Sequence, residues 1–253
     1  MKKKLGVILI ATGKYSEFIE PLLKSIQSFN NFNYEISYYI FSDTDYSNEA
    51  KKINSYYWSE TNWPYPTLLR YHKICEIKEI LIKNDFLIYL DIDMQVKEFF
   101  PDFKDNYILS VKHPGYVKTK KAPFENNKLS KAYLSKAERQ IYVCGGVQGG
   151  DAKIYLNICQ QIKNDIDVDL EKNYIPKWHD ESYWNKYVNK AIHKQVLDRS
   201  YCWPEQWVTT QNPGRIVALQ KRHQDFRNNI KLSKKLKFEI SNLFMSLKKP
   251  RKY

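Results

Sequence analysis

Two short acidic segments carry the residues of this chain best suited to chemistry. Asp91 and Asp93 directly follow an apolar run, and His179, Asp180 and Glu181 stand together further along the chain. Two carboxylates at positions i and i+2 on leaving a strand can face one divalent cation, and oxygen ligands suit Mg²⁺ or Mn²⁺. A solvated strand end is the commoner outcome for an isolated Asp-x-Asp, so the rest of the chain must support the metal-site interpretation.

The elements around the first acidic pair predict an α/β fold. The apolar run 86–90 ends abruptly at Asp91, as a buried strand of a mainly parallel sheet does. In open α/β sheets, ligands bind beyond the carboxyl ends of such strands. Alternating strand and helix patterns follow along the chain. The predicted strands are 5–11, 34–41, 86–90, 107–111 and 194–197, and the predicted helices are 16–29 and 68–83.

Seven blocks follow one another across nearly the whole sequence, at residues 10–15, 63–70, 91–94, 113–116, 145–150, 178–187 and 221–228. The most distinctive is Trp-His-Asp-Glu-Ser at 178–182, followed by Asn-Lys-Tyr at 185–187. In this order they resemble glycosyltransferase family 6, the family of the histo-blood-group A and B transferases and the α-1,3-galactosyltransferases. The resemblance implies a glycosyltransferase-A fold: a single Rossmann-like nucleotide-sugar-binding sheet with an acceptor-binding C-terminal half.

The resemblance also implies a UDP-sugar donor bound with a metal ion. Asp91 and Asp93 would hold Mn²⁺, or alternatively Mg²⁺, on the diphosphate, where a cation offsets the charge that grows on the leaving UDP. Lys221 and Arg227 would close over the same diphosphate. The donor-binding residues implied in this way are Ile10, Ala11, Thr12, Tyr15, Arg70, Gly145, Gly146, His179, Asp180, Lys221 and Arg227.

Glu181 is the catalytic residue that the resemblance implies. The family keeps the α configuration of the transferred sugar, so one direct backside attack is not the whole path. Either a covalent glycosyl intermediate forms on Glu181, or Glu181 stabilises an oxocarbenium-like transition state during front-face attack. His179 and Asp180 would bind donor hydroxyls. Asp180 could instead cap a helix that begins near Ser182, because Asp favours the N-cap.

Specificity is predicted from two further sets of residues. In the relatives, glycine at the position of Gly146 leaves room for an acetamido group, whereas alanine favours galactose, so UDP-GalNAc is predicted and UDP-Gal is the alternative. The residues that resemble acceptor-binding ones are His113, Trp178, Trp203 and Glu205. The predicted reaction is α-1,3 transfer of GalNAc to a galactose-terminated glycan, fucosylated as in H antigen or unfucosylated. That acceptor could be lipid-linked, as in lipopolysaccharide assembly.

The charge of the chain is concentrated at its C-terminal end. Residues 231–253 carry eight basic residues against Glu239, which is +7 of the net charge of +13. Apolar residues at 232, 236, 240, 243, 244 and 247 share one helical face, so the segment is predicted to be a basic amphipathic helix. It would lie on an anionic membrane surface or pack on its own domain. We therefore predict a catalytic domain at 1–230 and a basic tail at 231–253.

Several other classes of protein are disfavoured by the sequence. No nucleic-acid motif accompanies the charge, so nucleic-acid binding is not predicted. No apolar stretch approaches the roughly 18 to 20 residues of a membrane span. The four cysteines lack metal-like or redox spacing. A cytoplasmic enzyme is predicted, with peripheral contact to the inner face of the cytoplasmic membrane. The competing class is a non-catalytic basic adaptor that binds membrane or glycan.

The Lys-rich stretch 118–139 is predicted to be an insertion or mobile segment near the site.

Overall fold

The computed structural model describes residues 2–29, 34–98, 100–222 and 226. The predictions made for Arg227 and for the basic tail 231–253 lie outside these described residues.

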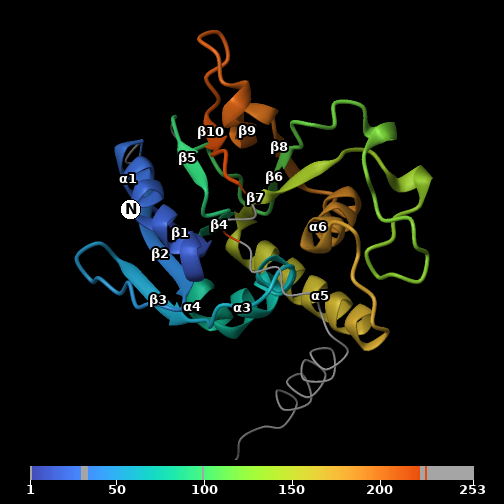
Figure 1. Cartoon of the computed structure of the whole chain (residues 1–253), viewed down its shortest axis with the longest axis horizontal. Helices are drawn as coiled ribbons and strands as arrows, with labels where there is room; N and C mark the ends of the chain where they lie inside the picture. Colours follow the sequence, from blue (N-terminus) through green and yellow to red (C-terminus); the bar gives the residue numbers. More distant parts are fainter. Residues whose placement is uncertain (1, 30–33, 99, 223–225, 227–253) are drawn as a thin grey trace, which may run out of the picture.

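A seven-stranded mixed sheet forms the centre of the molecule, in the order β3-β2-β1-β4-β7-β6-β8 (Figure 1). Its strands are β1 (Lys3–Ile10), β2 (Tyr34–Ser42), β3 (Ile53–Tyr57), β4 (Phe86–Leu90), β6 (Ile108–Lys112), β7 (Val143–Asp151) and β8 (Lys194–Leu197). Of these strands β7 alone runs antiparallel to its neighbours. The α/β fold class and all five predicted strands are confirmed, with ends shifted by two residues at most.

Both faces of the sheet are covered, which explains the continuous apolar runs in its central strands. In β1, Leu5, Val7 and Leu9 pack on the face that carries α1 (Ile19–Ser28), while Ile8 and Ile10 pack on the opposite face. That opposite face carries α3 (Arg70–Glu76), α5 (Ala152–Glu171) and α6 (His179–Lys190), which Figure 1 shows grouped away from α1. Successive strand residues point to opposite faces, so a strand buried on both sides has no polar alternation.

Two large elements, β7 and α5, were not predicted. Strand β7 has the sequence VCGGVQGGD, and glycine inside a strand normally weakens it. Here the glycines allow close approach, because a Cβ on Gly149 would collide with the carbonyl oxygen of Leu87 in β4. Gly150 also adopts a φ of +128°, which favours glycine. At the end of the strand the Asp151 carboxylate accepts hydrogen bonds from the backbone N–H groups of Lys153 and Ile154 and caps α5.

Both predicted helices are broken into shorter pieces. The first becomes a 3-10 turn at Gly13–Phe18 followed by α1. Pro21 explains this break, because its ring would clash with the carbonyl of Glu17 if the α-helix began earlier. The second becomes α2 (Tyr65–Leu68), α3 and α4 (Lys78–Leu81). The remaining short helical turns are Thr119–Lys121, Lys136–Glu138, Arg199–Cys202 and Glu205–Trp207.

The Lys-rich stretch 118–139 is an irregular connection with its own contacts. Phe124 and Leu134 form a small apolar cluster with Tyr142. The buried Asp169 of α5 accepts hydrogen bonds from the Ser130 hydroxyl (2.6 Å) and the Lys131 backbone N–H (2.9 Å). These contacts attach the stretch to α5, on the face of the sheet that also carries α3 and α6. Within the described residues, no helix is long and apolar enough to cross a membrane.

The topology creates a ligand-binding edge. Strands β1 to β4 are parallel, so the segments that follow them meet at one edge of the sheet. The chain proceeds outward from β1 to β3 and then returns to β4 on the other side of β1, which makes the β1–β4 boundary a topological switch point. A small second sheet of β5 (Met94–Val96), β10 (Ile216–Ala218) and β9 (Trp203–Pro204) lies just beyond β4. It brings the C-terminal part of the chain back to that edge, where the Leu219 N–H donates to the Asp93 carbonyl (2.9 Å).

Candidate active site

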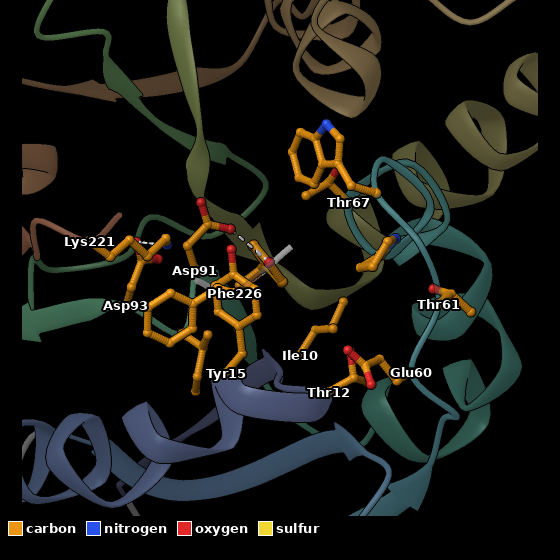
Figure 2. Close-up of a pocket in the computed structure, with 14 residues that line it drawn as sticks. Ile10, Thr12, Tyr15, Glu60, Thr61, Thr67, Asp91, Asp93, Lys221 and Phe226 are labelled. Carbon is orange, nitrogen blue, oxygen red and sulfur yellow. Dashed lines mark hydrogen bonds and ion pairs between the residues drawn. The ribbon is translucent and has the colours of Figure 1, made fainter. Parts of the chain in front are cut away.

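A cavity of about 210 Å³ opens at the switch point between β1 and β4. Figure 2 shows Asp91, Asp93 and Lys221 on one side of it and Thr12 and Glu60 on the other. The predicted donor-binding residues that line it are Ile10, Thr12, Tyr15 and Lys221, and the predicted metal ligands Asp91 and Asp93 line it too. Ala11 is fully buried beside them, and its N–H donates to the carbonyl of Phe41.

The two aspartates of the predicted metal pair contact different basic side chains. Asp91 accepts hydrogen bonds from the Tyr89 hydroxyl (2.8 Å) and from Arg70 (3.4 Å). The Asp93 carboxylate pairs with the Lys221 ammonium group. Burial and the charge of Asp91 together raise the pKa of Asp93 above its ordinary value. Positive charge between the two carboxylates would relieve this repulsion.

The donor set fits a hard divalent cation. Both ligands are carboxylate oxygens, which Mg²⁺ and Mn²⁺ prefer. Among the described residues, no group of three or more His, Cys, Asp and Glu side chains could hold a metal ion. A cation held by Asp91 and Asp93 would therefore take its other ligands from water or from a bound substrate.

Arg70 connects the separate parts of the site. Its side chain is 2% exposed, and the guanidinium donates to the Gly145 carbonyl (2.9 Å). It also pairs with Asp180 (3.2 Å) and Asp91 (3.4 Å), which come from α6 and from the end of β4. The ring of Tyr89 lies against it, 4.2 Å from the guanidinium carbon to the ring centroid. One buried cation thus joins α3, β4, β7 and α6.

Asp180 lies inside α6 rather than at its cap. The helix begins at His179 and its N-cap residue is Trp178, so the predicted helix start near Ser182 and the capping role of Asp180 are wrong. Burial raises the pKa of Asp180 to about 6, although Arg70 opposes the shift. His179 has a φ of 42°, and its ring packs edge-on against Trp63 with centroids 5.0 Å apart.

Glu181 is held by two hydrogen bonds. One oxygen accepts from the Tyr142 hydroxyl (2.7 Å) and the other from the Gly145 N–H (2.9 Å). Burial raises the pKa of Glu181 to about 7, and these two bonds partly oppose the shift. A carboxylate with such a pKa, fixed at a ligand-binding edge, is typical of a catalytic acid, base or nucleophile.

Asn185 attaches α6 to β7 and so fixes Glu181. Its side-chain oxygen accepts from the Val143 N–H (2.8 Å), and its side-chain nitrogen donates to the Val143 carbonyl (2.8 Å). We expect Asn185→Ala to lower the free energy of unfolding by about 1–3 kcal/mol, because two buried backbone groups lose their partners. Urea denaturation measures this loss. Asn164→Ala, on the exposed face of α5, is the control and should change stability little.

The predicted acceptor residues lie on the next segments of the same edge. His113 follows β6, and its Nδ1 accepts from the Gly115 N–H (3.0 Å). Burial lowers the pKa of His113 to about 4, so the ring is neutral. Because Nδ1 accepts a hydrogen bond, the proton of the neutral ring is on Nε2. The rings of His113 and Tyr142 lie 5.7 Å apart, which brings His113 close to the residue that holds Glu181.

The remaining acceptor candidates are more dispersed. Trp178 is 39% exposed at the start of α6. The Trp203 indole N–H donates to the Trp207 carbonyl (3.0 Å). The Glu205 carboxylate accepts a hydrogen bond from the Gln220 N–H (2.7 Å), and Gln220 directly precedes Lys221. Glu205 therefore anchors the segment that delivers Lys221 to Asp93.

Sequence reasoning missed several contributors to the site, among them Tyr142, Gln148 and Phe226. Tyr142 holds Glu181, but no motif marks it. Gln148, fully buried in β7, accepts from the Tyr71 hydroxyl (2.9 Å) and donates to the Gly145 carbonyl (2.7 Å). Phe226 packs against Tyr15 with ring centroids 5.2 Å apart. Only Gln148 had a signal, because a polar residue in a glycine-rich apolar strand needs a buried partner.

Known proteins match this chain along most of its length. The model of glycosyltransferase family 6 matches residues 1–228. O-antigen biosynthesis glycosyltransferase WbnI of Escherichia coli is 28% identical, over 90% of this chain and 99% of its own length. Histo-blood group ABO system transferase 1 of Rattus norvegicus is 24% identical, over 88% of this chain and 68% of its own. Globoside alpha-1,3-N-acetylgalactosaminyltransferase 1 of Homo sapiens is also 24% identical, over 79% of this chain and 61% of its own.

Proposed function

The chain belongs to glycosyltransferase family 6, and we propose that it transfers GalNAc from UDP-GalNAc, with retention of configuration, in α-1,3 linkage to a galactose-terminated glycan. Family membership makes it a glycosyltransferase with the glycosyltransferase-A fold. The finer proposal rests on one observation: Asp91 and Glu181 are hydrogen-bonded to two adjacent residues of β7. The Asp91 N–H donates to the Gly146 carbonyl (2.8 Å), and the Gly145 N–H donates to Glu181 (2.9 Å).

These adjacent contacts favour a site in which Asp91 and Glu181 act on different parts of one bound donor. Asp91 and Asp93 would hold Mn²⁺ or Mg²⁺, which when bound offsets negative charge on the donor diphosphate. Lys221 adds a positive charge on the same side of the cavity. Glu181 bonds to Gly145 and not to Gly146, and in this proposal that separation from Asp91 leaves it available to the sugar. That separation suits a retaining transferase, in which the carboxylate acts on the face away from the leaving group.

The acceptor is proposed to bind between the end of β6 and the start of α6. The neutral His113 ring can donate its Nε2 proton to an acceptor hydroxyl, and Trp178 and Trp203 can stack on sugar rings. The contact of Glu205 with Gln220 favours an anchoring role over direct acceptor binding. The O-antigen relative supports a bacterial surface polysaccharide as the acceptor, assembled on the cytoplasmic side of the membrane. A lipid link and membrane contact through 231–253 are part of the same proposal.

Donor choice is proposed to depend on Gly146. A Cβ there would lie 2.7 Å from an Asp91 carboxylate oxygen and 2.8 Å from the Met94 methyl carbon. We expect Gly146→Ala to lower kcat/KM with UDP-GalNAc and with UDP-Gal, because Asp91 must move. The ratio of kcat/KM with UDP-GalNAc to kcat/KM with UDP-Gal should also fall by about tenfold or more, since the added methyl takes space beside the sugar.

Parallel kinetics with the two donors measure both effects in wild type and in Gly146→Ala. If the ratio favours UDP-Gal already in the wild type, the enzyme is an α-1,3-galactosyltransferase, which is the alternative proposal. If the variant keeps the wild-type ratio, Gly146 does not select the donor.

The overall proposal is tested by transfer from UDP-GalNAc and UDP-Gal to 2′-fucosyllactose and to lactose, with Mn²⁺ and then with EDTA. We expect product with UDP-GalNAc and a galactose-ended acceptor, and its loss in EDTA. Product that persists in EDTA would contradict the metal role of Asp91 and Asp93. Absence of transfer and of donor hydrolysis in every combination would contradict the transferase proposal itself.

A further inference from the structure

On the side of the cavity opposite the aspartates, only Thr12 has a predicted role so far, as a donor-binding residue. That side is formed by Thr12, at the end of β1, and by Glu60 and Thr61, which follow β3. Figure 2 shows the Glu60 carboxylate turned into the cavity toward Ile10, with Thr61 beside it. This side is therefore polar and partly anionic, whereas the opposite side combines Lys221 with the two aspartates that would hold a cation.

The position of Glu60 depends on a glycine in the loop after β1. Gly13 has a φ of +57°, and its N–H donates to the Asp43 carboxylate (3.1 Å). A Cβ on Gly13 would lie 2.6 Å from an oxygen of Glu60 and 2.8 Å from its carboxyl carbon. The missing side chain is what makes room for the carboxylate. Strand ends β1, β2 and β3 thus combine to seat Glu60 at the wall of the cavity.

Thr61 supplies an independent indication of a ligand. Its hydroxyl oxygen is buried and has no hydrogen-bond partner among the described residues. A buried polar group without a partner carries a free-energy cost, so such groups are usually satisfied by protein, water or ligand. Thr61 lines the same cavity as Glu60, and a bound molecule can supply the missing bond.

The chemistry of this side identifies the part of the ligand that it suits. In the proposed function a divalent cation on Asp91 and Asp93 joins Lys221 in attracting phosphate, so the diphosphate of a bound donor belongs on that side and away from the Glu60 carboxylate. The nucleoside is then left for the Glu60 side. A carboxylate accepts hydrogen bonds and gives none when ionised, and the ribose hydroxyls are donors in a neutral part of the molecule. Nucleotide-binding sheets use an acidic side chain on ribose hydroxyls in this way.

Resting on the proposed function, we infer that Glu60, with Thr61, binds the ribose hydroxyls of the donor and selects ribonucleotides over deoxyribonucleotides. Gly13 contributes by leaving space for the Glu60 carboxylate. None of these three residues needs to contact the transferred sugar or the acceptor.

The test is calorimetric titration of the full chain, in Mn²⁺, with UDP, 2′-deoxy-UDP and 3′-deoxy-UDP. The wild type should bind UDP about tenfold or more tightly than at least one deoxy analogue, because a hydrogen bond to a charged group is lost. Glu60→Gln should weaken UDP binding by a similar factor and leave that analogue nearly unchanged, so that the discrimination collapses. Thr61→Val should show a smaller loss. Glu49→Gln, an exposed carboxylate outside the cavity, is the matched control.

The outcomes separate this inference from the proposed function. If the wild type binds UDP but Glu60→Gln keeps the full discrimination, the inference is overturned and the transferase proposal stands. If the wild type binds none of the three nucleotides, the proposed function fails and the inference falls with it. Far-ultraviolet circular dichroism and thermal unfolding of each variant show that a loss of binding does not come from a loss of fold.

Discussion

Glu181→Gln is expected to lower kcat on the order of 10³-fold at saturating donor and acceptor. The substitution keeps the shape of the side chain but removes the negative charge with which, in the proposed mechanism, the carboxylate attacks the anomeric carbon or stabilises positive charge on it. Binding of UDP should change little, because Glu181 is bonded to Gly145 and is not among the described residues that line the cavity with Lys221. Steady-state kinetics combined with UDP titration measures both quantities. A variant that keeps near wild-type kcat would remove Glu181 from the mechanism.

The pKa of Glu181 adds a pH signature to this result. In the proposed mechanism the carboxylate acts only when ionised and its pKa is raised to about 7, so kcat/KM of the wild type should rise with pH, with its midpoint near 7, and level off at higher pH. Tyr142→Phe removes a hydrogen bond that holds this pKa down, so its profile should move to higher pH. A mere packing defect in Tyr142→Phe would lower the rate without moving the profile.

Stability should respond to the same group. The folded pKa of about 7 lies above the ordinary value of 4.5, so the stability associated with Glu181 is full below about pH 4.5 and is lost as pH rises through 7. Glu181→Gln should therefore be more stable than the wild type at pH 8, and the difference should shrink on acidification. Urea denaturation of the wild type and the variant, at pH 8 and at an acidic pH, separates this outcome from a general loss of structure.

Arg70→Ala is expected to lower the free energy of unfolding by about 3–5 kcal/mol, because it leaves the carboxylates of Asp180 and Asp91 without their buried cation. It should also abolish measurable transfer, since both acids and the Gly145 carbonyl lose their shared anchor. Arg70→Lys keeps the charge but not the planar fork that reaches three partners, so it should recover stability better than activity.

Urea denaturation and transfer assays of both variants measure these effects. Arg215→Ala is the control for loss of an arginine, because the side chains of its ion pair with Glu98 are 46% and 55% exposed. Exposed pairs of this kind contribute about 0–1 kcal/mol. If Arg70→Ala were no more destabilised than Arg215→Ala, the guanidinium would not be the link that the geometry indicates.

Local patterns in the sequence were enough to predict the α/β class and five strands. A run such as 86–90 is buried on both faces, so it is apolar throughout and needs no tertiary information to be identified. The specific order of motif blocks was enough to predict the family, because residues such as Trp178 to Ser182 resemble it strongly in type and spacing. The same blocks contain most residues that line the cavity, including Asp91, Asp93 and Lys221.

Strand β7 and the residues around it could not be predicted in the same way. Its glycines are unfavourable for a strand by themselves, and only the close approach of β4 makes them necessary. The capping role considered as an alternative for Asp180 is wrong because α6 begins at His179 and not near Ser182. The actual partner of Asp180, Arg70, is distant in sequence and reaches it only when α3 and α6 pack on one face.

The sequence by itself determined which residues carry charge and chemistry, because residue type and local spacing are properties of the chain. The tertiary structure alone decided which of them meet. Tyr142 on Glu181, Glu205 on the Gln220 N–H and Glu60 over Gly13 all join segments that no local pattern relates. Hydrogen bonds of this kind depend on atomic positions within a few tenths of an ångström, and packing of the whole sheet sets those positions.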